Sequence, residues 1–390
     1  MRLSQRVQRL APSATVSIAT KVRELEAQGV DVIGLSLGEP DFDTPDHIKE
    51  AATKAMRDGY TKYSHPQGFP KLREAVSGYV ERRTGIARGS ERVFVGSGAK
   101  HVLYILFEAL LDEGDEVVIP APYWVTYPEQ VKLAGGVPVI VPTTEEQGFF
   151  LLPEALERAV TPRTKALILN TPSNPTGSAY PRGLMAEIVK ICEKHGVLVV
   201  SDEVYGELVY EGSHASALPE AANPDSVFLV DAVSKTYAMT GWRVGWGVGA
   251  KEIISAMARL QGQETTHPCL IAQVASVAAL SGPQETVAKM RGEFRKRRDM
   301  VVSRLSGMDG VFCRMPEGAF YAFPDVGKLF GRGVEDSLSL VEYLLEEAHV
   351  GLVPGSAFGA EGFFRLSYAA AYDRLVEALD RIERALGRLG

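Results

Sequence analysis

Short apolar runs alternate with longer stretches of helical spacing along most of the chain. The runs that predict strands are residues 93–95, 117–119, 166–169, 197–200, 227–230 and 244–248. Residues 101–111 and 182–194 carry apolar positions at helical spacing between them. This strand and helix rhythm predicts an α/β fold, a mainly parallel sheet covered by helices.

The last third of the chain has a different pattern. From about residue 252 the spacing is helical, and the charged segment 291–304 predicts a long helix that links two units. A second, smaller α+β unit is expected after Pro316. The basic cluster at 295–298 could suggest nucleic acid, but the net charge of -7 favours a solvated helix face. We therefore expect no nucleic-acid partner.

Composition is ordinary for a soluble globular protein, with 390 residues, 45% apolar and 23% charged. The three cysteines, Cys192, Cys269 and Cys313, are odd in number and fit neither a disulfide framework nor a zinc pattern. They predict a reducing, cytoplasmic location. The seven histidines lack paired spacing, so no metal is expected.

The N-terminal residues 1–10 leave two readings open. Three arginines there could belong to an organellar transit peptide. Leu3, Val7 and Leu10 recur at helical spacing, which favours an amphipathic arm. No apolar run approaches the roughly 18 residues of a membrane span, so no membrane partner is expected.

Lys235 comes five residues after the end of the predicted strand 227–230, and Arg243 comes eight residues after Lys235. Lysine rarely tolerates burial without a partner. A primary amine at such a place suits condensation with a carbonyl group, either of a substrate or of pyridoxal phosphate. The alternative reading is a lysine that is simply solvated.

Other strand ends carry complementary chemistry, and ligands bind beyond the carboxyl ends of parallel strands. Gly98 and Ala99 precede a helix and could bind a phosphate through backbone N–H groups. Asp202 could keep a pyridinium nitrogen protonated, unless it is only a helix N-cap. Tyr205 could donate to a ring oxygen, and Arg365 could bind a carboxylate.

The weaker signals have structural alternatives. Residues 174–177 could be only a turn, and the Gly96–Gly98 pair lacks the third glycine of a dinucleotide fingerprint. The order and placement of these groups together favour a single site.

Eight motifs carry a resemblance over nearly the whole length. They are Gly38-Glu39-Pro40-Asp41-Phe42, Tyr60-Thr61-Lys62-Tyr63, Pro122-Tyr123-Trp124, Ser173-Asn174-Pro175-Thr176-Gly177, Ser201-Asp202-Glu203-Val204-Tyr205, Ser234-Lys235 with Gly241-Trp242-Arg243-Val244-Gly245, Gly318-Ala319-Phe320-Tyr321 and Arg365-Leu366-Ser367. The chain resembles the class I aminotransferases, fold-type I enzymes that use pyridoxal 5'-phosphate. It is most similar to the bacterial aspartate and prephenate aminotransferases.

The resemblance implies a role for each matching residue. Lys235 would carry the cofactor and shuttle the proton, and Asp202 would pair with the pyridine nitrogen. Ring contacts would come from Asn174, Tyr205 and Trp124. The residues around the phosphate would be Gly98, Ala99, Lys100, Ser234, Arg243 and Tyr63, the last from a second subunit of an obligatory homodimer. The residues around the substrate would be Gly38, Trp124, Asn174, Arg365, Lys100 and Thr15.

The same resemblance implies a domain plan: an arm at 1–12, a small domain from 13–45 with 291–390, and a large cofactor-binding domain at 46–290. One residue departs from the family pattern. Ala232 stands where many relatives carry glycine or serine, so a serine contact to phosphate would be missing.

Substrate choice rests on Lys100 and Thr15, which in similar enzymes bind the distal carboxylate of dicarboxylic substrates. Lys100 could instead be a solvated residue in a first helical turn, where a cation opposes the helix dipole. The expected reaction is transamination, most directly of aspartate with 2-oxoglutarate. Prephenate, aromatic or broad specificity, a lyase on the same fold, and a non-catalytic ligand sensor remain as alternatives.

Overall fold

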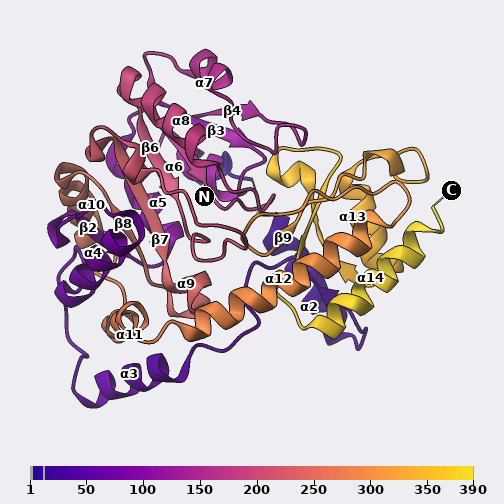
Figure 1. The fold of residues 1–390 in the computed structure, drawn as a ribbon, viewed down its shortest axis with the longest axis horizontal. Helices are drawn as coiled ribbons and strands as arrows, with labels where there is room; N and C mark the ends of the chain where they lie inside the picture. The colour runs from indigo at the N-terminus through magenta and orange to yellow at the C-terminus, as the bar shows by residue number, and fades with distance from the viewer. Residues whose placement is uncertain (1–2, 12–13, 390) are drawn as a thin grey trace.

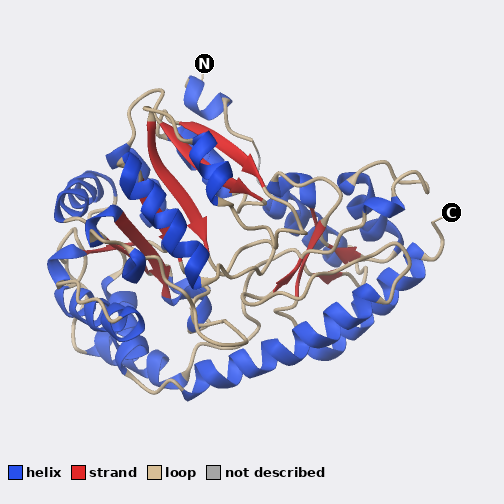
Figure 2. Ribbon diagram, turned by 45° about the horizontal axis from the view of Figure 1, so that its top comes forward, coloured by secondary structure: helices blue, strands red, loops and turns tan. Residues whose placement is uncertain are grey.

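A seven-stranded sheet forms the centre of the larger part of the molecule (Figures 1 and 2). The computed structural model describes residues 3–11 and 14–389. The strand order is β2-β8-β7-β6-β5-β3-β4. The strands are β2 (Val93–Gly96), β3 (Glu116–Ala121), β4 (Val137–Pro142), β5 (Thr164–Asn170), β6 (Leu198–Asp202), β7 (Val227–Ala232) and β8 (Gly245–Val248).

The sheet is mainly parallel, as the sequence predicts, with β8 as the exception. β8 pairs antiparallel with both β2 and β7, whereas β3, β4, β5, β6 and β7 form parallel pairs. A parallel return needs a crossover of a dozen or more residues, usually with a covering helix. Between β7 and β8 the chain forms only the short helix α9 (Val233–Thr236) and a 3-10 turn (Thr240–Trp242), so it comes straight back.

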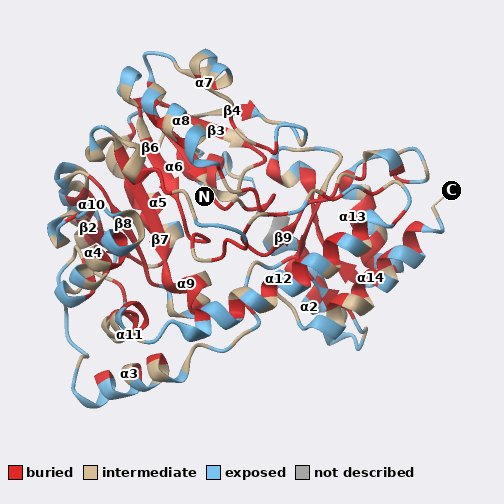
Figure 3. Ribbon diagram, viewed as in Figure 1, coloured by how far each residue is buried: buried red, intermediate tan, exposed pale blue. Residues whose placement is uncertain are grey.

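The helices cover both faces of this sheet. Alternate strand residues point into two separate apolar cores, one under α5, α6 and α10 and the other under α3, α4, α8 and α11. Figure 3 shows the strands buried between helices that are exposed on their outer sides. The helices are α3 (Asp46–Arg57), α4 (Pro70–Thr84), α5 (Ala99–Leu110), α6 (Thr126–Leu133), α7 (Pro153–Ala159), α8 (Arg182–His195), α10 (Lys251–Glu264) and α11 (Leu270–Ser281).

A smaller α+β unit lies beside the large sheet (Figure 1). Its three-stranded sheet has the order β11-β12-β9, and β1 pairs in parallel with β10. The elements are α2 (Ala14–Ala27), β1 (Ile33–Gly34), β9 (Tyr321–Ala322), α13 (Ser337–Glu347), β10 (Val350–Gly351), β11 (Val353–Pro354), β12 (Phe364–Ser367) and α14 (Tyr372–Leu386). N-terminal and C-terminal segments thus share one core, and the domain boundaries expected from the sequence remain a prediction.

Helix α12 (Glu285–Ser306) runs from one part to the other (Figures 1 and 2). Val287 packs in the core of the large sheet, whereas Met290 and Phe294 pack in the core of the small unit. The predicted linking helix therefore exists, and it begins earlier than expected.

The basic cluster on α12 is not a uniformly solvated face. Arg297 and Arg298 are 5% and 3% exposed, while Arg295 and Lys296 face solvent. Arg297 pairs with Asp41 at 2.7 Å. Arg298 makes a two-pronged contact with Glu211, at 2.9 and 2.8 Å. Half of the cluster therefore ties α12 to segments that the sequence does not reveal as neighbours.

The N-terminal arm contains the short helix α1 (Gln5–Gln8), and the backbone N–H of Ala11 donates to Glu129 on α6 at 3.0 Å. The arm thus contacts its own subunit. Within the described residues, the helices are all too short or too polar to cross a membrane.

Candidate active site

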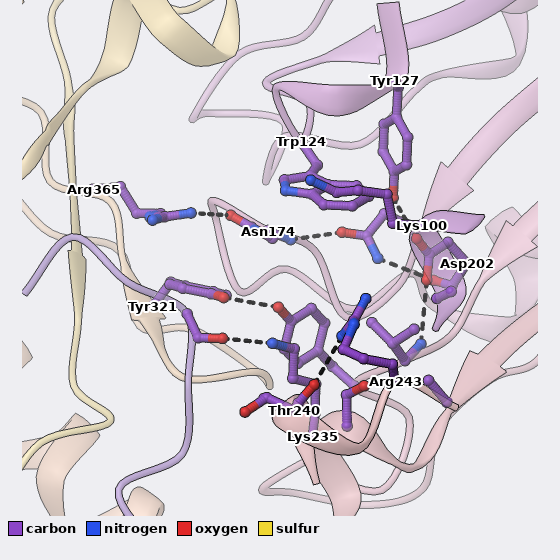
Figure 4. Close-up of a pocket in the computed structure, with 17 residues that line it drawn as sticks. Lys100, Trp124, Tyr127, Asn174, Asp202, Lys235, Thr240, Arg243, Tyr321 and Arg365 are labelled. Atoms are coloured by element: carbon purple, nitrogen blue, oxygen red, sulfur yellow. Dashed lines mark hydrogen bonds between the residues drawn. The ribbon is translucent and has the colours of Figure 1, made fainter. Parts of the chain in front are cut away.

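A cavity of about 320 Å³ lies where the carboxyl ends of β5, β6 and β7 meet the small unit (Figure 4). Parallel strands end on the same edge of a sheet, so side chains far apart in sequence converge there. The predicted residues that line it are Gly38, Ala99, Lys100, Trp124, Asn174, Asp202, Tyr205, Ser234, Lys235, Arg243 and Arg365. Ala232 also lines the cavity, and its methyl group offers no hydroxyl to a phosphate.

Lys235 lies on α9, immediately after β7. Its Nζ donates to the carbonyl of Gly38, a residue from the N-terminal part of the chain. Burial lowers the pKa of the lysine to about 8, and the nearby cations Arg243 and Arg365 act in the same direction. A substantial fraction of the amine is therefore neutral near physiological pH, which is the form that attacks a carbonyl.

Asp202 ends β6 and is 2% exposed. Tyr127 donates to its Oδ2 at 2.7 Å. Burial raises the pKa of this carboxyl to about 6, although the hydrogen bond from Tyr127 opposes the rise. A buried carboxylate of this kind is stabilised by a protonated nitrogen placed against it.

Arg365 lies on β12 and projects from the small unit toward the large one. Its guanidinium donates to Asn174 Oδ1 at 2.8 Å and to the carbonyl of Ser36. The ring of Tyr321 lies 4.6 Å and that of Phe358 5.0 Å from its charged carbon. The Nε atom is buried without a partner among the described residues, so the group is prepared for an anionic ligand.

Arg243 lines the cavity near the N-terminus of α5. Gly98, the N-cap of α5, lies against the Arg243 guanidinium but does not itself line the cavity. Both backbones have positive φ, 87° at Gly98 and 57° at Arg243. The φ of 87° favours glycine at position 98, and a Cβ there would also lie 2.5 Å from the guanidinium of Arg243 and would displace it. Backbone N–H groups and an arginine at a helix N-terminus make an anion site.

Lys100 occupies the first turn of α5, with its Nζ 4.9 Å from the centre of the Trp124 ring. Burial, followed by the charge of Arg243, lowers its pKa. No ion pair with a described carboxylate holds this amine in the structure. Its position beside the cavity leaves it available to a ligand's negative charge.

Two predicted residues lie elsewhere. Tyr63 is 89% exposed, and it borders a separate groove of about 580 Å³ together with His267 and Leu270. The role expected for it, from a second subunit, stays a prediction. Thr15 is the second residue of α2, but its side chain lies outside the described part of the chain.

Sequence reasoning gave no role to five residues that line the cavity: Tyr127, Asn170, Val204, Thr240 and Tyr321. Asn170 links two strand ends, because it donates to the Asp202 carbonyl at 3.0 Å and accepts from Asn174 N at 2.7 Å. The only sequence signal for Tyr127 is its position three residues after Trp124, one helical turn away. Tyr321 belongs to a recognised motif, but its contacts at the cavity, with Tyr205 and Arg365, are with segments distant in sequence.

Known proteins match this chain along its length. The family model for aminotransferase class I and II covers residues 30–382. The aspartate aminotransferase of Geobacillus stearothermophilus is 49% identical over 388 residues, 98% of each chain. The aspartate/prephenate aminotransferase of Cereibacter sphaeroides is 47% identical over 391 residues, again 98% of each chain.

Solved structures agree with the sequence matches. The aspartate aminotransferase from Rhizobium meliloti superimposes with a TM-score of 0.96 at 40% identity, covering 100% of both chains. The Thermus thermophilus enzyme with maleate gives 0.95 at 45% identity, covering 99% of this chain and 100% of that one. These matches confirm the expected fold-type I architecture. The chain belongs to the class I and II aminotransferase family, and it is an aminotransferase.

Proposed function

We propose that this enzyme transfers the amino group of a dicarboxylic amino acid, most directly aspartate, to 2-oxoglutarate with pyridoxal 5'-phosphate as cofactor. The observation that carries the proposal is the charge of the cavity wall. Among the described lining residues, Lys100, Lys235, Arg243 and Arg365 are cationic, and Asp202 is the one carboxylate. Such a surplus of positive charge calls for a ligand set with several negative groups.

The cofactor's chemistry fits the groups present. Ala99, Ser234 and Arg243 line the cavity and would hold the phosphate, together with the N-terminus of α5 that follows Gly98. Asp202, buried and with a raised pKa, would hold the protonated ring nitrogen. Tyr205 and Asn174 would contact the ring oxygen, and Trp124 would cover a ring face. When bound, the cofactor supplies an aldehyde and an electron-withdrawing ring.

The chain's own groups supply binding and proton transfer. Lys235 Nζ can hold or release a proton near neutral pH because burial lowers its pKa to about 8. We assign it the proton taken from the substrate α-carbon. Arg365, backed by Asn174 at 2.8 Å, would fix the α-carboxylate and so orient the bond that breaks.

Lys100 supports the choice of a substrate with a second carboxylate. Arg243 has the phosphate and Arg365 the α-carboxylate as proposed partners. Lys100, which would also border the phosphate, lines the same cavity with no ion pair to a described carboxylate. Of the two relatives described above, one is an aspartate aminotransferase and the other an aspartate/prephenate aminotransferase. Prephenate, which also carries two carboxylates, is therefore the second candidate.

A panel of amino donors tests the proposed function. The purified enzyme, loaded with pyridoxal 5'-phosphate, is mixed with aspartate, glutamate, alanine or phenylalanine, and the half-reaction is followed by absorbance. A parallel series starts from enzyme loaded with the aminated cofactor, pyridoxamine 5'-phosphate, and offers 2-oxoglutarate, oxaloacetate and prephenate as amino acceptors. We expect the acidic donors to react fastest. Equal or faster reaction of alanine would contradict a dicarboxylate enzyme.

Replacing Lys100 by alanine should lower kcat/KM for aspartate and glutamate by roughly ten- to hundredfold, the value of a partly desolvated charged hydrogen bond. The kcat/KM values for alanine and phenylalanine should fall much less, because these substrates lack the distal carboxylate. The decisive quantity is the ratio of kcat/KM for aspartate to that for a neutral amino acid. An unchanged ratio would mean that another residue recognises the side chain.

Lys132→Ala serves as the matched control for this variant. Its amine pairs with Glu129 at 2.8 Å, and it does not line the cavity. This variant should keep the wild-type ratio.

We further propose a homodimer whose subunits share active sites through Tyr63. Sedimentation should show a dimer or an assembly of dimers. Tyr63→Phe alone should weaken cofactor binding by roughly ten- to hundredfold, through a lost phosphate contact. Mixed with inactive Lys235→Ala subunits, it should form hybrids with one intact site, about a quarter of all sites by statistical pairing. A fully active monomer, or no recovery after subunit exchange, would contradict the shared site.

A cytoplasmic location is proposed on the state of the cysteines. Cys192 and Cys313 are buried free thiols, and Cys269 is an exposed free thiol. Free thiols suit a reducing compartment.

A further inference from the structure

Tyr321 connects the two halves of the cavity. It lies on β9 of the small unit and is 1% exposed. Its hydroxyl is 2.7 Å from the hydroxyl of Tyr205, which follows β6 of the large sheet. Its ring lies against the Arg365 guanidinium, 4.6 Å from ring centre to charged carbon (Figure 4). Tyr321 thus contacts both Tyr205, a proposed cofactor-binding residue, and Arg365, the proposed carboxylate-binding residue.

We infer that Tyr321 is a positioning residue that acts through Tyr205, donating its hydroxyl proton so that Tyr205 can donate to the cofactor ring oxygen. The inference rests on the proposed function. A tyrosine hydroxyl has one proton and can also accept. If Tyr205 gives its proton to the cofactor, the 2.7 Å contact requires Tyr321 to be the donor. Successive hydrogen bonds polarise one another, so the second tyrosine strengthens the first as a donor.

The backbone around Tyr321 fixes its side chain in this position. Ala319, two residues earlier, has a φ of 58°, which is uncommon for a residue with a Cβ. A Cβ on Gly318 would lie 2.6 Å from Pro172, so this strand start is pressed against the large unit. A Cβ on Gly38 would lie 1.9 Å from the Tyr321 hydroxyl. The hydroxyl therefore fills the space that a side chain at Gly38 would need.

Few other charged or titratable groups surround the tyrosine pair. Arg365 faces Tyr321 from β12, and Asp202 lies near Tyr205 at the end of β6. Lys235 approaches from α9 through its contact with Gly38. Both tyrosines are deeply buried, and burial raises their pKa values, so both hydroxyls stay protonated at working pH.

The hydroxyl and the ring of Tyr321 have separable roles, and two variants distinguish them. Tyr321→Phe removes the hydroxyl and keeps the ring beside Arg365. Tyr321→Leu removes both. We expect the first to lower kcat about three- to tenfold with little change in KM for aspartate. The second should also raise KM, because Arg365 loses the ring that orients it.

The pH titration of the bound cofactor's absorbance gives a spectral pKa. This pKa would not change if Tyr321 had only a structural role. A donor to the ring oxygen favours the deprotonated chromophore, in which that oxygen carries more negative charge. Loss of the Tyr321 hydroxyl should therefore raise the spectral pKa of the holoenzyme by about 0.5–1 unit. Tyr321→Leu should raise the spectral pKa by a similar amount. If one of the two variants folds poorly, the other still tests the inference.

A double-variant cycle tests whether Tyr321 acts through Tyr205. Tyr205→Phe should raise the spectral pKa further than Tyr321→Phe does. In the Tyr205→Phe background, Tyr321→Phe should add less than about 0.2 unit, because the intermediary is gone. An unshifted pKa in Tyr321→Phe, or a full shift that persists without the Tyr205 hydroxyl, would overturn the inference. If the wild-type protein shows no cofactor absorbance at all, the proposed function fails instead.

Discussion

Replacing Lys235 by alanine should reduce turnover at least about a thousandfold, because one amine is assigned both the covalent attachment and the proton transfer. The neighbouring cations Arg243 and Arg365 cannot substitute, since a guanidinium stays protonated. Single-turnover kinetics with aspartate measures the loss. Added methylamine should restore part of the rate if the missing function is a proton-transferring amine.

Borohydride labelling provides the independent control for Lys235. Reduction of the wild-type holoenzyme should fix the cofactor to one peptide, the one that contains Lys235. Lys100→Ala should give the same labelled peptide, and Lys235→Ala should give none. A label on any other lysine would refute the assignment.

Changing Asp202 to asparagine should lower kcat/KM by roughly 10²–10⁴, the second largest effect expected at this site. Asparagine has nearly the same shape but no negative charge, so the ring nitrogen would lose the group that keeps it protonated. The cofactor should still bind, because the substitution does not alter the proposed phosphate site near Gly98 and Arg243. Stopped-flow absorbance of the half-reaction with aspartate measures the change. A rate within threefold of wild type would remove Asp202 from the proposed role.

Tyr127→Phe is the graded comparison for Asp202. It removes one hydrogen bond to the same carboxylate, and it should lower kcat/KM only about three- to tenfold.

The stability of the cofactor-free protein gives a second measurement of the Asp202 environment. The Asp202 pKa is raised from 3.8 to about 6 in the fold, so the folded state binds this proton more tightly. Stability should therefore fall as pH rises from about 4 to about 6, and Asp202→Asn should lack that component.

The strand and helix order could be read from the sequence because most strands are short apolar runs between helices. β4 was missed, since its apolar pattern is interrupted by Pro138 and Pro142 and much of it is exposed. The strand predicted at residues 117–119 is longer in the structure, where β3 continues through Pro120 to Ala121. At that point β3 pairs with β4 only, and its register with β5 ends at Val118, so the missing N–H is tolerated.

The candidate site could be predicted as far as strand ends and motifs define it. Lys235, Asp202 and Asn174 each follow a strand, and strand ends converge in a parallel sheet. Tyr321 and Tyr127 could not be assigned this way. Their importance comes from contacts with Tyr205 and Asp202, more than seventy residues away along the chain. The burial of Arg297 escaped detection for the same reason, because its partner Asp41 is distant in sequence.

The continuity of α12 has a mechanical consequence. A helix of 22 residues is about 33 Å long at 1.5 Å per residue, and such a rod transmits rotation with little bending. Turning it by 5° about the end held in the large core sweeps the other end through roughly 3 Å. That arc is as long as the contact from Arg365 to Asn174, 2.8 Å, which joins the two parts across the cavity. The width of the candidate site therefore depends on the tilt of one helix, and a small change in that tilt is magnified at Arg365, the proposed carboxylate-binding residue.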